Sequence, residues 1–172
     1  EISMEVPLVI SNHYDLKAIC SDFDVHFEYV PMPPKNKEVA ERTILNLLKD
    51  HRIELGVLAK YMQVLSSGFL NDFPRMINIH HSFLPAFKGA QPYHRAWDRG
   101  VKLIGATAHY VTEDLDDGPI IEQTIAHVSH RDEVEDLIRI GRDTERLALS
   151  RAVRLHLNRQ VMVYRGRTAV FA

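Results

Sequence analysis

The chain has 172 residues, of which 45% are hydrophobic and 26% are charged, and its formal net charge is −2. This length suits one domain with a core of ordinary size, and the composition excludes an intrinsically disordered chain. Lys and Arg number 21 against 23 Asp and Glu. The two signs are interspersed, without a basic stripe among aromatic residues, so we expect no binding to nucleic acid.

The first half of the chain alternates strand-like and helix-like segments. Short β-rich apolar runs predict strands at 6–11, 26–32 and 55–61, and apolar residues at helical spacing predict a helix over 37–51. Asn12 is expected to cap a short helix after the first strand. The run at 55–61 has little polar alternation, so we expect a central strand covered on both faces.

The second half predicts further helices and strands, which end in a hairpin. Ser129 suggests a capping box for the long helix near the end of the chain. In chain order, the predicted elements are a short helix (66–73), a strand (76–82), a helix (91–100) stopped by Gly100, two strands (103–111 and 119–128), a long amphipathic helix from about Asp132 and a hairpin around Arg165–Gly166.

Strands that alternate with helices imply βαβ units. We therefore predict an α/β fold with a doubly wound, mostly parallel sheet and helices on its faces. The chain contains no internal repeat and no low-complexity linker, so residues 1–172 are treated as one domain.

Its cellular setting is predicted from cysteine content and hydropathy. Cys20 is the single cysteine, so the chain forms no internal disulfide, as in proteins of a reducing compartment. The sequence has no apolar run as long as a membrane span and no signal-peptide pattern. We expect a cytoplasmic protein that does not bind membranes.

Asn78 and His80 are the first candidates for chemistry. In a doubly wound sheet, ligands bind beyond the carboxyl ends of the strands, and the strand at 76–82 ends here. Alternation places Asn78 and His80 on one face and His81 on the other, unless the strand has already turned. An amide beside an imidazole can polarise a carbonyl group. A capping or core role is the alternative for His80.

The loop that follows the strand at 103–111 is the second candidate. It carries four acidic residues between Glu113 and Asp117. A histidine that acts as an acid near neutral pH needs an anionic neighbour. We expect Glu113 and Asp114 to be solvated, and at least one carboxylate of this loop to face inward.

Metal binding is another interpretation, but the sequence has no HExxH motif and no cysteine-rich spacing, so we predict no metal. The side chains that could supply ligands are His80, His81, His109 and Asp116. The roles of His94 and His109 stay open. The other histidines are expected to be structural or exposed: His13, His26, His51, His127, His130 and His156.

Two long motifs resemble the formyltransferase family that uses 10-formyltetrahydrofolate. They are NIHHSFLPAFKGAQPYHRA (78–96) and GATAHYVTEDLDDGPIIEQ (105–123), and the likeness extends over essentially the whole chain. The transferases have proline at the position of His81, so the sequence motif around His81 resembles that of the hydrolase branch. The resemblance implies hydrolysis of 10-formyltetrahydrofolate to formate and tetrahydrofolate in one-carbon and purine metabolism. It implies no cofactor, because the folate is the substrate.

The resemblance also assigns a catalytic triad. The family's N-x-H motif falls on Asn78 and His80, and its aspartate before x-Gly-Pro falls on Asp116. It implies that Asn78 donates to the developing oxyanion of the formyl group. Protonated His80 would share that role or deliver a proton to the leaving N10, and Asp116 would support the imidazolium and orient or deprotonate the water. The role of His81 stays open.

The same resemblance places the pterin ring against main-chain groups of residues 62–65 and of the loop at 112–116. It also places the cation of Lys37 near the folate. Core packing is the alternative for the apolar residues of the first segment, and a solvated charge is the alternative for the cation. The implied substrate-binding residues are Lys37, Met62, Gln63, Val64, Leu65, Thr112, Glu113, Asp114 and Leu115.

Family members have a strand, a turn and a helix before the segment that matches 6–11, and the hydrolases carry an ACT-type regulatory domain further upstream. The additional strand would lie between the strands at 6–11 and 55–61, whose inner edges are otherwise unpaired. We therefore expect a natural protein longer than this chain. The apolar length of the last helix and hairpin predicts a homo-oligomer.

Two rival functions stay open. One is transfer of the formyl group from the same folate to an amine acceptor. The sequence motif HHSF at 80–83 argues against this transfer. The other is a non-catalytic folate-binding module. The combination of Asn78, His80 and Asp116 favours an enzyme, because binding alone does not require it.

Overall fold

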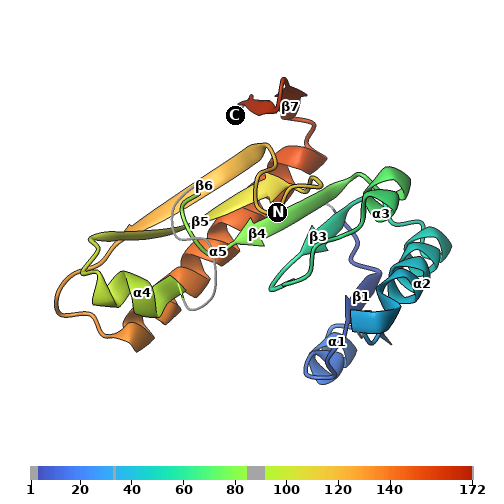
Figure 1. Ribbon diagram of the computed structural model, residues 1–172, viewed down its shortest axis with the longest axis horizontal. Coiled ribbons are helices and arrows are strands. Elements are labelled where there is room, and N and C mark those ends of the chain that lie inside the picture. The colour runs from blue at the N-terminus through green and yellow to red at the C-terminus, as the bar shows by residue number, and fades with distance from the viewer. Residues whose placement is uncertain (1–3, 33, 85–91, 172) are drawn as a thin grey trace. The chain divides into compact units, whose positions relative to one another are not determined.

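The computed structural model describes residues 4–32, 34–84 and 92–171 (Figure 1). The chain divides into two compact units, Glu1–Leu55 with Leu65–Pro74 and Gly56–Val64 with Arg75–Ala172. Within the described ranges, no helix has both the length and the apolar character needed to cross a membrane.

The first unit contains a two-stranded parallel sheet and helices. Its predicted strands and helices are confirmed, but Asn12 caps no helix, since the first helix begins only after Leu16. The elements are β1 (Leu8–Ser11), α1 (Lys17–Asp22), β2 (His26–Tyr29), a 3-10 turn (Pro34–Asn36), α2 (Lys37–Asp50) and α3 (Ser67–Asp72).

A buried carboxylate joins α2 to the start of α3. Glu41 is 4% exposed and accepts hydrogen bonds from the backbone N–H of Ser66, at 2.9 Å, and from its hydroxyl. The hydroxyl oxygen of Ser66 in turn accepts the N–H of Phe69 at 3.1 Å. Ser66 is thus the N-cap of α3, and Glu41 holds that cap in place.

The second unit is built around a four-stranded sheet of order β3-β4-β5-β6. The β3–β4 pair is parallel, whereas β4–β5 and β5–β6 are antiparallel, and β7 and β8 form a separate antiparallel hairpin. Its elements are β3 (Gly56–Leu58), β4 (Met76–His80), α4 (Pro92–Asp98), β5 (Leu103–Tyr110), β6 (Ile120–His127), α5 (Val134–Leu157), β7 (Val161–Tyr164) and β8 (Arg167–Val170).

The α/β class is confirmed, with a sheet that is mixed rather than parallel in this unit. A parallel neighbour for β4 would require a crossover that packs on the sheet. Instead α4 packs on α5, and the chain returns as an antiparallel strand. Expecting a central strand at 55–61 was wrong for the described chain, because β3 lies at a sheet edge and Val57 is 43% exposed. The additional strand beside it stays a prediction.

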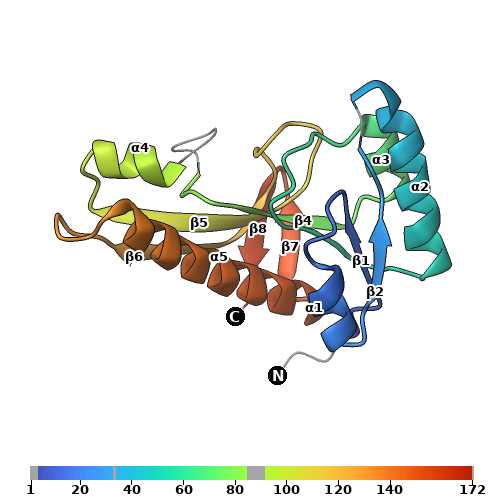
Figure 2. The same cartoon turned by 90° about the horizontal axis from the view of Figure 1, so that it is seen from below.

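Helix α5 covers one face of this sheet (Figure 2). Tyr110, at the end of β5, makes a 2.8 Å hydrogen bond from its hydroxyl to Nδ1 of His156 on α5. Since side chains alternate along a strand, fully buried Ala106 points the same way as Tyr110. Thr107 and His109 therefore point to the opposite face.

Local signals explain where the last elements begin and turn. Glu133 and Asp136 form a capping box at the start of α5, so the prediction that Ser129 does so was wrong. The predicted hairpin turn is confirmed, with positive φ angles of 49° at Arg165 and 72° at Gly166. Two successive left-handed residues form the turn that matches the twist of a two-residue hairpin.

Candidate active site

Two neighbouring register rows of the sheet bring polar side chains together. Asn78 pairs with His109 in one row. Two residues further along, in the next row whose side chains point to the same face, His80 pairs with Thr107, which in turn pairs with Gln123. Residues directly opposite each other in antiparallel strands present their side chains on the same face. These side chains therefore share the face opposite α5.

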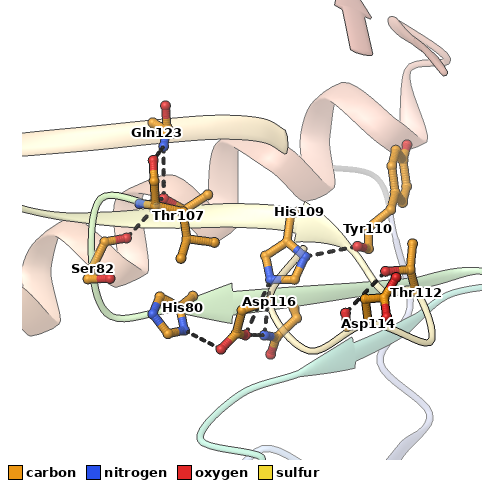
Figure 3. Close-up of polar contacts among 11 residues, drawn as sticks. His80, Ser82, Thr107, His109, Tyr110, Thr112, Asp114, Asp116 and Gln123 are labelled. Carbon is orange, nitrogen blue, oxygen red and sulfur yellow. Dashed lines mark hydrogen bonds and ion pairs between the residues drawn. The ribbon is translucent and has the colours of Figure 1, made fainter. Parts of the chain in front are cut away.

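Asp116, from the loop between β5 and β6, completes this cluster (Figure 3). Its Oδ2 lies 3.1 Å from Nδ1 of His80, and its Oδ1 lies 3.3 Å from Nδ2 of Asn78. The side chains of His80 and Asp116 are only 7% and 13% exposed. The expectation that one carboxylate of the acidic loop faces inward is confirmed, and Glu113 and Asp114 are exposed, as expected. The catalytic roles of the three residues stay predictions.

The backbone around Asp116 explains why the loop has this sequence. Asp116 adopts φ = 54°, a left-handed conformation that aspartate tolerates better than most residues. A Cβ on Gly118 would lie 1.7 Å from the carbonyl oxygen of Tyr110. Only glycine therefore lets the loop pack against the end of β5, where Tyr110 N–H donates to the carbonyl of Pro119 at 3.0 Å.

The surroundings of His80 act on its pKa in opposite directions. Burial lowers the pKa of His80 below its ordinary 6.5, and although Asp116 opposes this, the neighbouring His81 and His109 lower it further. A neutral His80 that donates from Nδ1 to Asp116 has its lone pair on Nε2. Among the described residues, that buried Nε2 has no hydrogen-bond partner. The lowered pKa favours the neutral ring, and the catalytic role of a protonated His80 stays a prediction.

His109 is a member of the site that sequence reasoning left undecided. It is 2% exposed, its Nδ1 donates to the carbonyl of Tyr110 at 2.9 Å, and its Nε2 accepts from Nδ2 of Asn78 at 3.2 Å. This pattern assigns the acceptor lone pair of the ring to Nε2. It also means that both N–H groups of Asn78 are engaged, one by His109 and one by Asp116. Donation by Asn78 to an oxyanion thus requires exchange of one bond.

His81 does not lie on the far face of the sheet. Strand β4 ends at His80, so the alternation rule stops there and the chain has already turned. The rings of His80 and His81 stack, with centroids 4.6 Å apart and an interplanar angle of 23°. His81 is therefore a direct neighbour of the site.

The residues predicted to bind substrate are divided between the two units. Lys37 and Leu65 belong to the first unit, where Lys37 Nζ lies 3.6 Å from Glu41 and Leu65 is buried, 7% exposed. Core packing is thus confirmed for Leu65, and it is wrong for Met62 and Val64, which are 76% and 47% exposed. The members in the second unit are all exposed: Met62, Gln63, Val64, Thr112, Glu113, Asp114 and Leu115.

A cavity of about 620 Å³ opens beside Asp116. Its lining includes Gly118, Gln123 and, from the hairpin, Arg167 and Thr168. Ligand pockets commonly have volumes of roughly 300–1,000 Å³, and this cavity lies within that range. The hairpin's part in this wall was not found from the sequence, because nothing in a local pattern places β8 beside β6. Within the described residues, no group of three His, Cys, Asp or Glu is arranged to hold a metal ion.

An α/β fold with a buried histidine–carboxylate–amide cluster at a strand end defines an enzyme-like site. The family model for formyl transferases matches residues 1–153. The chain belongs to this family.

Relatives within the family carry two kinds of name. A formyltetrahydrofolate deformylase of Synechocystis sp. is 59% identical over all of this chain and 61% of its own length. The crystal structure of a formyltetrahydrofolate deformylase from Pseudomonas syringae pv. tomato superimposes with a TM-score of 0.94 at 48% identity, over 99% of this chain and 58% of its own. The crystal structure of a glycinamide ribonucleotide transformylase from Symbiobacterium toebii superimposes with a TM-score of 0.90 at 31% identity, over 99% of this chain and 82% of its own. The chain thus spans less than two thirds of the length of these two deformylases.

Proposed function

We propose that this protein hydrolyses 10-formyltetrahydrofolate to formate and tetrahydrofolate. The observation that carries the proposal is the buried His80, which donates from Nδ1 to Asp116 and keeps a lone pair on Nε2 without a partner among the described residues. Identity of 59% and 48% to two deformylases, against 31% to a transformylase, favours water over an amine as the acceptor.

The proposed chemistry uses His80 as a proton carrier. Nε2 accepts a proton from water while the water oxygen bonds to the formyl carbon, and Asp116 stabilises the imidazolium that forms. The imidazolium then returns the proton to N10 as the oxyanion re-forms its C=O bond and the C–N bond breaks. This leaves tetrahydrofolate and formic acid, which releases its remaining proton to water as formate. A neutral resting His80 suits the first step, because a protonated ring has no lone pair to accept the proton.

Asn78 is proposed to stabilise the oxyanion of the tetrahedral intermediate. Its 3.3 Å bond to Asp116 is longer than usual for an N–H···O hydrogen bond, so this N–H is the one that can be exchanged. A developing oxyanion attracts the N–H more strongly than a neutral formyl oxygen does. Asn78 therefore favours the transition state over the bound substrate.

The proposal extends to the whole protein. It keeps Lys37 and residues 62–65 and 112–115, each within its own unit, as proposed folate-binding residues. It requires no cofactor, and it assigns the enzyme to the cytoplasm in one-carbon and purine metabolism. Exposed apolar side chains on β7 and β8, such as Met162, Tyr164 and Val170, support a homo-oligomer. The proposal includes a natural protein longer than this chain, which the greater length of the two deformylases supports.

The decisive experiment measures formate released from 10-formyltetrahydrofolate by the full-length protein, without an acceptor and with EDTA present. We expect turnover that His80→Ala abolishes and that His130→Ala, a change at an exposed histidine, leaves intact. Absence of formate release would refute the hydrolase, and supplying amine acceptors would then test the transferase. Loss of turnover only when EDTA is present would reveal dependence on a metal.

A further inference from the structure

A buried hydroxyl lies beside His80 in the same register row and contacts the turn that follows it. Thr107 is fully buried, and its Oγ1 donates to the carbonyl of Ser82 at 2.9 Å while it accepts the N–H of Leu84 at 3.1 Å. A third bond comes from Nε2 of Gln123, at 3.0 Å. A hydroxyl has one hydrogen to donate and two lone pairs, so every bond that Thr107 can make is made.

Gln123 reinforces this arrangement from the next strand. The same Nε2 also donates to the carbonyl of Leu84 at 3.3 Å, so the amide holds both the hydroxyl and the turn (Figure 3). We name Ser82, Leu84, Thr107 and Gln123 the Thr107 cluster. Its four hydrogen bonds join β5 and β6 to the turn that begins directly after His80.

We propose that Thr107 and Gln123 are positioning residues, which fix the turn at 82–84 and thereby hold His81 stacked against His80. The expected fall in kcat rests on the proposed hydrolysis. The structural basis of the inference is independent of the reaction. Strand β4 and its register with β5 end at His80, and the backbone after His81 is fixed through Ser82 and Leu84.

The physical consequence concerns the direction of the His80 lone pair. Asp116 fixes one side of that ring at Nδ1, and the stacked ring of His81 lies against its face. Without the Thr107 hydroxyl, the carbonyl of Ser82 and the N–H of Leu84 lose a buried partner and the turn relaxes. The Nε2 lone pair then points away from the reacting water, and misplacement by about 1 Å lowers rates by up to about 100-fold.

The test compares Thr107→Val, Thr107→Ser and Gln123→Met in the full-length protein. Thr107→Val keeps the shape and removes the hydroxyl, whereas Thr107→Ser keeps the hydroxyl. Thr124→Val is the matched control on β6, since the buried hydroxyl of Thr124 has no hydrogen-bond partner among the described residues.

For Thr107→Val we expect kcat to fall about 10- to 100-fold while KM changes less than about threefold, because the cluster sets geometry. Thr107→Ser should regain most of the activity, Gln123→Met should fall between these two variants, and Thr124→Val should match the parent protein. Thr107→Val with the parent kcat would overturn the proposal, as would Thr107→Ser with the low kcat of Thr107→Val.

A second measurement separates this proposal from the proposed function. Nitrogen NMR of the ring atoms of His80 and His81, with hydrogen exchange of the Leu84 amide, requires no turnover. We expect Thr107→Val to shift both ring signals and to speed exchange of the Leu84 amide at least about 10-fold, since that amide loses its hydrogen-bond acceptor. Unchanged ring signals would overturn the inference even if the parent protein releases formate. Shifted signals in a protein without turnover would support it and refute only the hydrolase.

Discussion

Gly118→Ala tests whether loop packing sets the position of Asp116. The added Cβ would lie 1.7 Å from the carbonyl oxygen of Tyr110, 2.9 Å from its carbonyl carbon and 3.2 Å from Nδ1 of His109. The nearest of these atoms belong to the backbone of a paired strand, so no side-chain rotation relieves the overlap. The loop that carries Asp116, two residues away, must move instead.

The size of that movement follows from the contact distance. An ordinary contact of about 3.5 Å requires a shift of roughly 1.8 Å from the present 1.7 Å. Asp116 would then lose its 3.1 Å contact with His80. Misplacement by about 1 Å lowers rates about 100-fold, so we expect at least that loss in kcat. Overpacking should also lower the free energy of unfolding by about 1–3 kcal/mol.

The assay is acceptor-free formate release, with thermal unfolding measured beside it. Gly68→Ala is the matched control, because a Cβ there meets only the hydroxyl oxygen of Ser66, at 3.8 Å, and lies within α3. Helix propensity predicts that this control gains up to about 1 kcal/mol of stability and keeps its activity. If Gly118→Ala were as active and as stable as the parent protein, the reasoning that loop packing positions Asp116 would be refuted.

Four further predictions concern Asn78, His80 and Ser66. Asn78→Ala should lower kcat about 100- to 1,000-fold by removing the oxyanion donor, and a kcat within about tenfold of the parent would contradict that role. With neutral His80 as the proposed base, its lowered pKa predicts that kcat/KM declines at a lower pH than for an ordinary histidine, whereas a rise in kcat/KM on acidification would favour a protonated acid. Because the pKa of His80 is lower in the folded than in the unfolded chain, the unfolded chain binds a proton at His80 first as the pH falls. The stability that neutral His80 contributes is therefore complete above pH 6.5 and is lost as the pH falls through the pKa of the folded chain. His80→Gln should thus lose less stability than the parent on acidification, measured by urea unfolding. Ser66→Ala removes the cap of α3 and leaves Glu41 short of a buried donor, so it should cost about 1–2 kcal/mol in thermal unfolding, and an unchanged Tm would refute this role.

Local patterns predicted most of the elements, because they depend on neighbours in the chain. The helix at 37–51 and the hairpin at Arg165–Gly166 were found from apolar spacing and turn chemistry. Caps were harder to predict, since several polar residues near a helix start compete for the same N–H groups. Ser129 is close to α5, but Glu133 and Asp136 form its capping box.

The sequence by itself determined the family and the cluster of Asn78, His80 and Asp116, because residue identity and order carry that information. Tertiary structure alone decided that His109 and Thr107 join them, since cross-strand register places residues about 30 positions apart side by side. It also decided the direction in which the pKa of His80 moves. An anionic neighbour would raise the pKa of a solvated histidine, but burial opposes the charged ring and prevails here. Burial depends on the surrounding elements, which no short stretch of sequence specifies.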